Sequence, residues 1–201
     1  KKVKDIVEAD GRRVVVVVSA PGKRFPEDNK ITDLLYLCHA HLKYGVSYDG
    51  IFSMIEDRFL EIQNELGLDV DLKGEFAKIR ASMHKNMSID YLVSRGEYLS
   101  GKLMAAYLGY DFVDATEWVV FGYDGKLDME KSQANLAAMF GEKSRVALPG
   151  FYGALPDGKV RVMSRGGSDI TGALAAAAID AGVYENWTDV SGILMADPRI
   201  V

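Results

Sequence analysis

Runs of apolar residues divide the first half of the chain into one strand and several helices. Residues 14–18 are five consecutive valines, a pattern typical of a strand buried on both faces within a parallel sheet. Elsewhere in this half, apolar residues recur at helical spacing. The expected helices cover residues 1–10, 31–42, 51–66 and 69–84. Ser88 is a suitable N-cap for a further helix, which we expect to run to about Tyr107 and to close at Gly109.

Shorter apolar stretches in the second half predict strands that alternate with two more helices. The expected strands cover residues 112–113, 118–121, 145–148, 151–152, 159–164 and 183–187, and the expected helices cover 129–140 and 170–181. Turn residues around Asp157 join two of the strands into a hairpin. This alternation predicts an α/β fold, a three-layer α/β/α sandwich with a mostly parallel sheet. We expect one domain over residues 1–201, with a fold that is incomplete at both ends.

Charge and composition narrow the classes of function. Hydrophobic residues make up 48% of the 201 residues and charged residues 26%, so the chain can bury a sizeable core. The formal net charge of −5 argues against nucleic acid or an anionic membrane surface as a partner. Residues 14–18 form a wholly apolar run that is far too short to span a bilayer. The single cysteine permits no disulfide within the chain, which favours the cytoplasm.

A glycine-rich junction joins the last hairpin strand to the helix that follows. The stretch SRGGSDITG places Arg165, Gly166, Gly167, Ser168 and Asp169 at the carboxyl end of this strand. Ligands of open α/β sheets bind at such ends, where a helix N-terminus offers free N–H groups to an anion. Glycines let a ligand approach the backbone, and an arginine suits a carboxylate or phosphate. The alternative is a simple turn, in which Ser168 is the N-cap and Arg165 faces solvent.

A carboxylate lies on a mostly apolar face of the helix expected after Ser88. The residues that share this face with Glu97 are Val93, Ser100, Met104 and Leu108. Burying a carboxylate is costly unless it meets a partner, and a ligand ammonium or an arginine would satisfy the charge. The alternative is a solvated position, in which Glu97 pairs with Arg95 or Lys102 at the surface.

Other polar residues allow both a functional and a structural interpretation. Thr188, Asp189 and Arg199, in the stretch NWTDVSGILMADPR, could line a nucleotide site or belong to a capped loop. Thr32 lies near the start of a helix, where N-capping or local backbone bonding is the default use of a threonine.

Several common site motifs are missing from the sequence. It contains no G-x-x-x-x-G-K-[ST] P-loop and no G-x-G-x-x-G after a strand. Cys38 and His41 share a helix face, but His39 points elsewhere, so we expect no metal site. Three histidines without a nucleophile motif give no basis for a Ser/His/Asp triad.

Six stretches of the chain, taken together and in order, resemble a known family. They are VVVVVSA, NKITDLL, SRGEYLSGKLMAAYL, PGFYGALPDGKV, SRGGSDITGALAA and YENWTDVSGILMADPR, of which S-R-G-E, S-R-G-G-S-D and W-T-D-V-S-G-I are the most specific. They resemble the aspartokinase family of the amino-acid kinase superfamily. The resemblance implies the carbamate-kinase-like fold and transfer of the γ-phosphoryl of ATP to the side-chain carboxylate of L-aspartate, with Mg²⁺ on the phosphates. The product, 4-phospho-L-aspartate, leads to lysine, threonine and methionine.

The resemblance also implies a role for each candidate residue. Glu97 would bind the α-ammonium of aspartate and Arg165 a carboxylate, and the other substrate-site residues would be Thr32, Ser168 and Ser19. Gly166 and Gly167 would approach the transferring group, and Asp169 would orient catalytic lysines. The implied nucleotide-site residues are Thr188, Asp189, Leu194 and Arg199.

Departures from the family pattern add further expectations. The family's N-terminal strand with its Lys-Phe-Gly-Gly-(Ser/Thr) loop, its later lysine-containing nucleotide segment and its ACT regulatory domains have no counterpart in these residues. We therefore expect little or no activity from the 201 residues alone. Leu194 stands where the family often has a tyrosine. The family implies a homodimer. The alternatives are a kinase for glutamate or another acidic substrate, and a non-catalytic ligand-binding module on the same fold.

Overall fold

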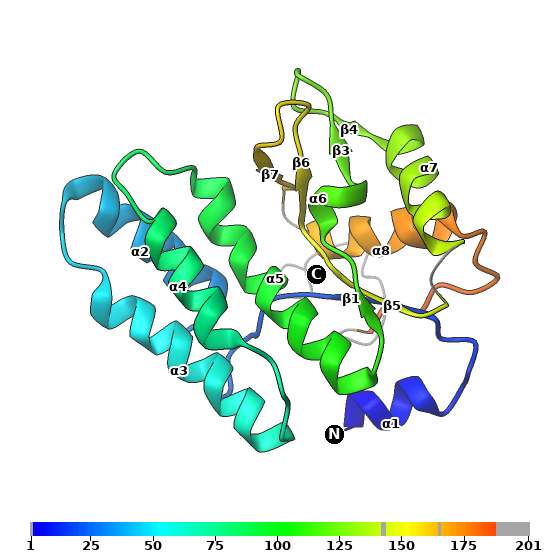
Figure 1. The fold of residues 1–201 in the computed structure, drawn as a ribbon, viewed down its shortest axis with the longest axis horizontal. Coiled ribbons are helices and arrows are strands. Elements are labelled where there is room, and N and C mark those ends of the chain that lie inside the picture. Colours follow the sequence, from blue (N-terminus) through cyan, green and yellow to red (C-terminus); the bar gives the residue numbers. More distant parts are fainter. Residues whose placement is uncertain (1, 142–143, 165, 188–201) are drawn as a thin grey trace, which may run out of the picture.

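In the computed structural model of this chain, a parallel sheet of three strands, ordered β1–β5–β2, lies at the centre of the molecule (Figure 1). Its strands are β1 (Val15–Val18), β5 (Val146–Pro149) and β2 (Asp111–Phe112). β1 and β2 both run parallel to β5, on its two sides, and Val15 lies opposite Val146. The run of valines therefore forms the parallel strand that its pattern predicts.

The structure describes residues 2–141, 144–164 and 166–187 of the chain. Outside the central sheet, most of these residues are helical. The helices are α1 (Lys2–Glu8), α2 (Ile31–Tyr44), α3 (Asp49–Leu66), α4 (Leu72–Ser82), α5 (Ile89–Leu108), α6 (Ala115–Trp118), α7 (Met129–Phe140) and α8 (Gly167–Ala178). Within the described ranges, none of them combines the length and the apolar character needed to cross a bilayer. A second, mixed sheet of four strands has the order β4–β3–β6–β7. Its strands are β3 (Val120–Phe121), β4 (Leu127–Asp128), β6 (Tyr152–Ala154) and β7 (Val160–Val162).

The side chains of β5 alternate between two cores, so the central sheet is covered on both faces. Val146 and Leu148 belong to a cluster that includes Leu174 of α8. Ala147, between them, belongs to a cluster that includes Leu108 of α5. α5 therefore covers one face and α8 the other, while α2 packs on α5 away from the sheet (Figure 1). This arrangement confirms the predicted α/β sandwich, and the single domain over residues 1–201 stays a prediction.

The long helix α5 has the ends that the sequence suggested. The Ser88 side chain accepts a hydrogen bond from the backbone N–H of Tyr91 at 3.5 Å, as an N-cap does. Gly109 closes the helix in the left-handed conformation, with φ of 68°. Between these ends, α5 contacts β1, β2, β5 and β7 and so carries Glu97 past the central sheet.

The strand expected over residues 118–121 begins later than predicted. Residues 115–118 form the short helix α6 instead, because Asp114 and Glu117 make a capping box at its start. Trp118, which closes this helix, is fully buried. Only Val120 and Phe121 remain for β3, so a strong local cap overrides the strand propensity of the aromatic and β-branched residues.

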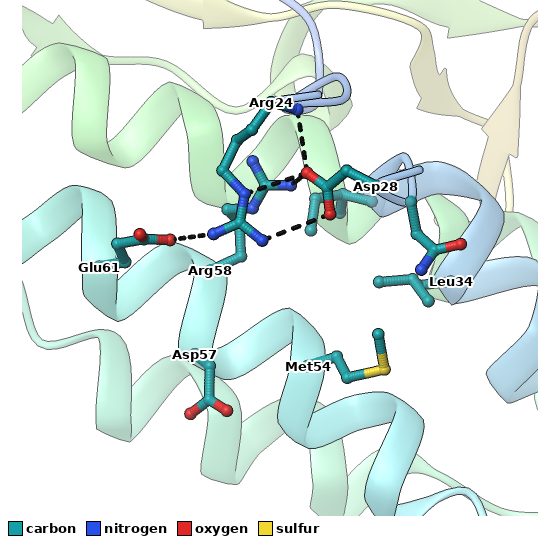
Figure 2. A pocket seen from close by; sticks show the side chains of 9 residues that line it. Arg24, Asp28, Leu34, Met54, Asp57, Arg58 and Glu61 are labelled. Carbon is teal, nitrogen blue, oxygen red and sulfur yellow. Dashed lines mark hydrogen bonds and ion pairs between the residues drawn. The ribbon is translucent and has the colours of Figure 1, made fainter. Parts of the chain in front are cut away.

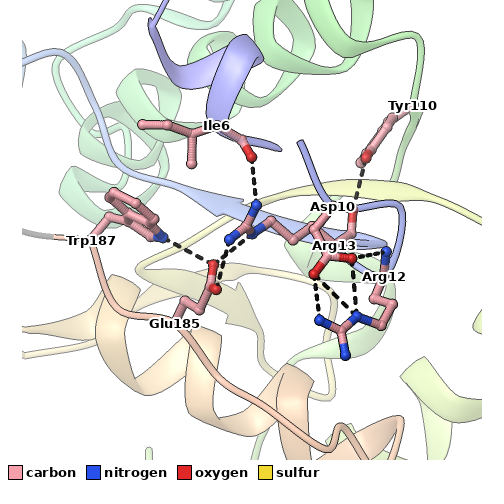
Figure 3. Close-up of polar contacts among 7 residues, drawn as sticks. All are labelled: Ile6, Asp10, Arg12, Arg13, Tyr110, Glu185 and Trp187. Carbon is pink, nitrogen blue, oxygen red and sulfur yellow. Dashed lines mark hydrogen bonds and ion pairs between the residues drawn. The ribbon is translucent and has the colours of Figure 1, made fainter. Parts of the chain in front are cut away.

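The strand expected over residues 183–187 is wrong, since the structure shows no strand there. Side-chain contacts hold this segment (Figure 3). Arg13 donates two hydrogen bonds to the carboxylate of Glu185, at 2.7 and 2.9 Å, and Trp187 Nε1 donates to the same carboxylate at 3.2 Å. The segment is therefore attached next to β1 by an ion pair rather than by a backbone ladder.

Candidate functional site

The carboxyl ends of β1 and β5 meet the start of α8 at one edge of the central sheet. The backbone N–H of Gly150, just after β5, donates to the carbonyl of Val18, the last residue of β1, at 2.9 Å. A Cβ on Gly150 would lie 2.7 Å from Ser168 Oγ in α8, so this approach requires glycine. Ser19 directly follows β1 and is exposed. The strand ends and the glycine-rich junction are thus neighbours, as a parallel sheet predicts.

The glycine-rich junction forms the N-terminus of α8. Gly166 is the N-cap, with a left-handed φ of 79°, and the structure records no side-chain hydrogen bond at this cap. Ser168 lies in the first turn, so its interpretation as the N-cap is wrong. The first amides of a helix have no partner within it and form the positive end of its dipole, so this terminus suits an anion. Arg165 lies outside the described residues.

The two glycines of the junction serve different purposes. A Cβ on Gly167 would lie 2.8 Å from the Cβ of Met163 and 3.0 Å from the Cα of Phe151. Gly167 is therefore needed for packing, and its approach to the transferring group stays a prediction. Gly166 is exposed, and its positive φ is the conformation that favours glycine.

Glu97 is buried on α5, with only 5% of the residue exposed. Burial raises the pKa of its carboxyl to about 7, against the opposing effect of hydrogen bonds from the backbone N–H groups of Glu97 and Ala20 and of the charge of Arg95. Among the described residues, Oε2 has no hydrogen-bond partner. A buried carboxylate with an oxygen in this state suits a cationic group that arrives with a ligand.

Two cations near Glu97 in the sequence are engaged elsewhere. Lys102 donates to Glu75 of α4 at 3.1 Å. Arg95 lies over the ring of Tyr98, 4.4 Å from its centroid, and is itself buried. The alternative of a surface ion pair for Glu97 is therefore wrong.

The loop between β1 and α2 contacts α5 beside Glu97. A Cβ on Gly96 would lie 2.9 Å from the Cβ of Ala20, so the helix and the loop touch at this point. A cleft of about 190 Å³ opens next to the contact, and its lining includes Ser19 and Ser100. Ser100 Oγ is buried without a hydrogen-bond partner among the described residues, as Glu97 Oε2 is. Two unsatisfied polar atoms thus lie on one face of α5, and of these two residues Ser100 lines the cleft.

Thr32 lies in the first turn of α2. The N-cap of this helix is Lys30, with no side-chain hydrogen bond recorded at the cap, so N-capping by Thr32 is wrong. The backbone N–H of Ile31 donates to the carbonyl of Pro21 at 3.2 Å. This bond places the start of α2 against the loop that carries Ser19, where Thr32 is half-buried.

An ion-pair network ties the same loop to α3 (Figure 2). Asp28 is buried and accepts hydrogen bonds from Arg24 and Arg58, and Arg24 also pairs with Glu61. The hydrogen bonds from Arg24 hold the pKa of the Asp28 carboxyl well below its usual range. The network borders a cavity of about 370 Å³. Both arginines already have carboxylate partners. The network therefore fixes the loop between β1 and α2, next to Ser19 and Thr32, against α3.

Asp169 lies in the first turn of α8 and is exposed. Its carboxylate accepts a hydrogen bond from Asn186 Nδ2 at 3.4 Å, and its carbonyl accepts one from the Tyr184 hydroxyl at 3.2 Å. These contacts attach the segment after α8 to the candidate site. The four residues of the predicted nucleotide site lie outside the described residues. They are Thr188, Asp189, Leu194 and Arg199.

Phe151, at the same edge of the sheet, was not among the residues singled out from the sequence. Its φ of 78° lies in a region that residues other than glycine rarely adopt. Its N–H donates to Thr171 Oγ1 at 3.1 Å, and its carbonyl accepts the N–H of Met163 at 2.7 Å. Strained backbone of this kind gathers at functional sites. The only signal in the sequence was the Pro-Gly pair that precedes it.

Cys38 is buried in the protein, and the two nearby histidines contact backbone carbonyls. Cys38 is buried, and burial raises the pKa of its thiol to about 12. His39 Nε2 lies 3.3 Å from the carbonyl of Met87, and His41 Nδ1 lies 2.7 Å from that of Ser47. Within the described part of the chain, no group of three or more His, Cys, Asp or Glu side chains could hold a metal ion.

Known proteins are similar to this chain in sequence and in fold. The sequence model of the Amino acid kinase family matches residues 1–201. The chain is 34% identical over 217 residues to Aspartokinase 3 of Bacillus subtilis (strain 168), which covers all of this chain and 47% of the relative. The structure of this chain matches that of Clostridium acetobutylicum aspartate kinase with a TM-score of 0.92 and 46% sequence identity. The match covers 99% of this chain and 46% of the Clostridium chain.

A second solved structure matches over almost the same range. E. coli aspartokinase III in complex with aspartate and ADP has a TM-score of 0.75 and 28% identity, over 98% of this chain and 47% of that chain. The chain therefore spans about half the length of the relatives it matches. Since the family model covers every residue and the structural match extends over nearly the whole chain, the chain belongs to the amino acid kinase family.

Proposed function

We propose that the protein that carries this chain is an aspartokinase, which transfers the γ-phosphoryl of ATP to the side-chain carboxylate of L-aspartate. The observation that carries the proposal is the buried carboxylate of Glu97, whose Oε2 has no partner among the described residues. A kinase that acts on a free amino acid needs such a group, because the α-ammonium is the cation that distinguishes this substrate. The names of the relatives support aspartate as the amino acid.

The arrangement of the site suggests how the substrate is bound. Glu97 receives the α-ammonium, and the N-terminus of α8, with Ser168 in its first turn, receives a carboxylate. Arg165 would add a planar, bidentate partner for the same carboxylate. Ser19 and Thr32 come from the loop and helix that border Glu97. Two opposite charges on two separate elements match a small zwitterion with an acidic side chain.

For this phosphoryl transfer, the protein has mainly to position the reactants and stabilise negative charge. The carboxylate of aspartate is itself the nucleophile, so no serine or cysteine has to be activated. Gly166 and Gly167 lie at the start of α8, where backbone N–H groups would stabilise the negative charge of the transferring group. Mg²⁺ on the phosphates supplies further neutralisation. The role of Asp169 in orienting lysines, the nucleotide site, the homodimer and the cytoplasmic location stay predictions.

The test uses the full-length protein that carries this chain. Formation of aspartyl phosphate from ATP is measured by trapping the product as its hydroxamate, with L-aspartate, L-glutamate and N-acetyl-L-aspartate as substrates. We expect turnover of L-aspartate alone, because N-acetylation removes the cation that Glu97 binds. In the variant Glu97→Gln, the KM for aspartate should rise by roughly a hundredfold, as for other charge pairs, while the KM for ATP changes little.

A matched control is Glu65→Gln, which changes an exposed carboxylate on α3. This variant should keep the wild-type KM for aspartate. Efficient phosphorylation of N-acetyl-L-aspartate, or a preference for glutamate, would overturn the assignment of the substrate. An unchanged aspartate KM in Glu97→Gln would overturn the role of Glu97.

A further inference from the structure

Thr171 has a fully buried hydroxyl that joins two elements of the candidate site. It lies one turn into α8 and is 0% exposed, so it cannot touch a substrate. Its Oγ1 donates to the carbonyl of Gly167 at 2.8 Å and accepts the backbone N–H of Phe151 at 3.1 Å. One hydroxyl thus links the first turn of α8 to the loop that follows β5.

The residue on the other side of this link is in a strained conformation. Phe151 has a φ of 78°, and a side chain at positive φ crowds its own backbone. Its ring packs against both major apolar clusters, and its carbonyl accepts the N–H of Met163 at 2.7 Å. The hydrogen bond to Thr171 holds the remaining backbone group of Phe151. Without that bond, the strain at Phe151 would favour rotation of its backbone toward a negative φ, which would move the loop.

Rotation of this loop would reach both halves of the candidate site. Gly150, the preceding residue, donates to the carbonyl of Val18 at the end of β1 and packs against Ser168 of α8. Ser19 follows Val18 directly, and the next residue, Ala20, contacts α5 at Gly96, beside Glu97. The loop therefore lies between the N-terminus of α8 and the segment that adjoins Glu97.

We propose that Thr171 is a positioning residue, whose hydroxyl fixes the strained loop against α8 and so sets the distance between the anion-binding N-terminus of α8 and the Glu97 carboxylate. This inference rests on the proposed function, since it assumes that aspartate is bound at both places. Loss of the link should weaken the binding of the substrate that spans the two subsites more than the binding of ATP.

The test compares variants of the full-length protein that differ at one hydroxyl. Thr171→Val keeps the shape of the side chain and removes the donor and acceptor, whereas Thr171→Ser keeps the hydroxyl. We expect Thr171→Val to raise the KM for aspartate roughly tenfold or more, because small misplacements in a site are costly. The KM for ATP should stay within about twofold, and Thr171→Ser should stay close to the wild type in both.

Two further measurements separate positioning from general loss of stability. Thr116→Val is the matched control, because it also removes a hydrogen-bonded threonine hydroxyl. Thr116 lies in α6, and its hydroxyl donates to the side chain of Asp114, the N-cap of α6, at 2.9 Å. It should leave the aspartate KM unchanged at temperatures where all variants are folded. Hydrogen exchange at the Phe151 amide should be faster in Thr171→Val and slow in Thr171→Ser. If Thr171→Val does not fold, the smaller Thr171→Ala carries the same expectations.

The outcomes distinguish this inference from the proposed function. Faster exchange at Phe151 together with an aspartate-specific rise in KM supports the inference. An unchanged aspartate KM, an equal change in both KM values, or unchanged exchange at Phe151 overturns it. Failure of the wild-type protein to phosphorylate aspartate would instead refute the proposed function, and the exchange experiment would still test the link between Thr171 and Phe151.

Discussion

Replacing Glu97 by glutamine should make the protein more stable at neutral and alkaline pH. Glutamine has nearly the same shape as glutamate but carries no charge, so the variant removes the cost of burying a carboxylate. Glu97 is 5% exposed, and burial raises the pKa of its carboxyl from the ordinary 4.5 to about 7. An acidic group whose pKa is raised in the folded state lowers the free energy of unfolding at every pH at which it is ionised in the unfolded chain.

The direction and size of the effect follow from these two values. Below pH 4.5 the carboxyl is protonated in both the folded and the unfolded chain, and ionisation costs nothing. Between pH 4.5 and 7 only the unfolded chain loses its proton, so the free energy of unfolding falls as the pH rises. Above pH 7 the cost is complete, at about 3 kcal/mol. About 2–3 kcal/mol of it develops between pH 5 and pH 8.

The assay is thermal unfolding of the full-length wild type and Glu97→Gln, at several pH values between 5 and 8 and without substrate. The melting temperature of the variant, relative to the wild type, should rise by roughly 2–4 °C across this range, since the shift per kcal/mol shrinks as the protein grows. Glu65→Gln, at an exposed position of α3, should follow the wild-type curve. A difference between Glu97→Gln and the wild type that stays constant with pH would refute the reasoning, because Glu97 would then ionise at no cost in the folded protein.

Two further predictions concern the binding of aspartate. Because an ammonium ligand favours the ionised form of Glu97, the KM for aspartate in steady-state assays should fall as the pH rises through about 7, and Glu97→Gln should abolish this step. Gly96→Ala would place a Cβ 2.9 Å from the Cβ of Ala20, so it should raise the aspartate KM severalfold, roughly. In the same assay Gly50→Ala, with open space at a helical glycine, should not change this KM.

Elements with strong local signals were predictable from the sequence. The valine run at 14–18 gave β1, because five consecutive β-branched residues fit a strand covered on both faces and little else. Ser88 and Gly109 set the ends of α5, since a cap acts through its nearest neighbours in the chain. The glycine-rich junction was placed correctly at a helix N-terminus by the same kind of local argument.

Features that depend on distant contacts were not predictable. The segment at 183–187 has the composition of a strand, but an ion pair to Arg13, far away in the sequence, determines its path. The burial of Glu97 could not be decided either, because it depends on the loop after β1 lying against α5. Phe151 carried almost no signal, since its positive φ arises from contacts with Thr171 and Met163.

Glycines at the edge of the central sheet permit close packing around the candidate site. The sequence suggested that Gly166 and Gly167 make room for a ligand, but Gly150 and Gly167 are crowded by protein atoms within 3.0 Å of where a Cβ would lie. Gly96 is crowded in the same way by the loop after β1. Their common effect is to bring the loop after β5 close to α8, and the loop after β1 close to α5 beside Glu97. Added methyl groups at these glycines should therefore disturb substrate binding even though none of them carries a functional side chain.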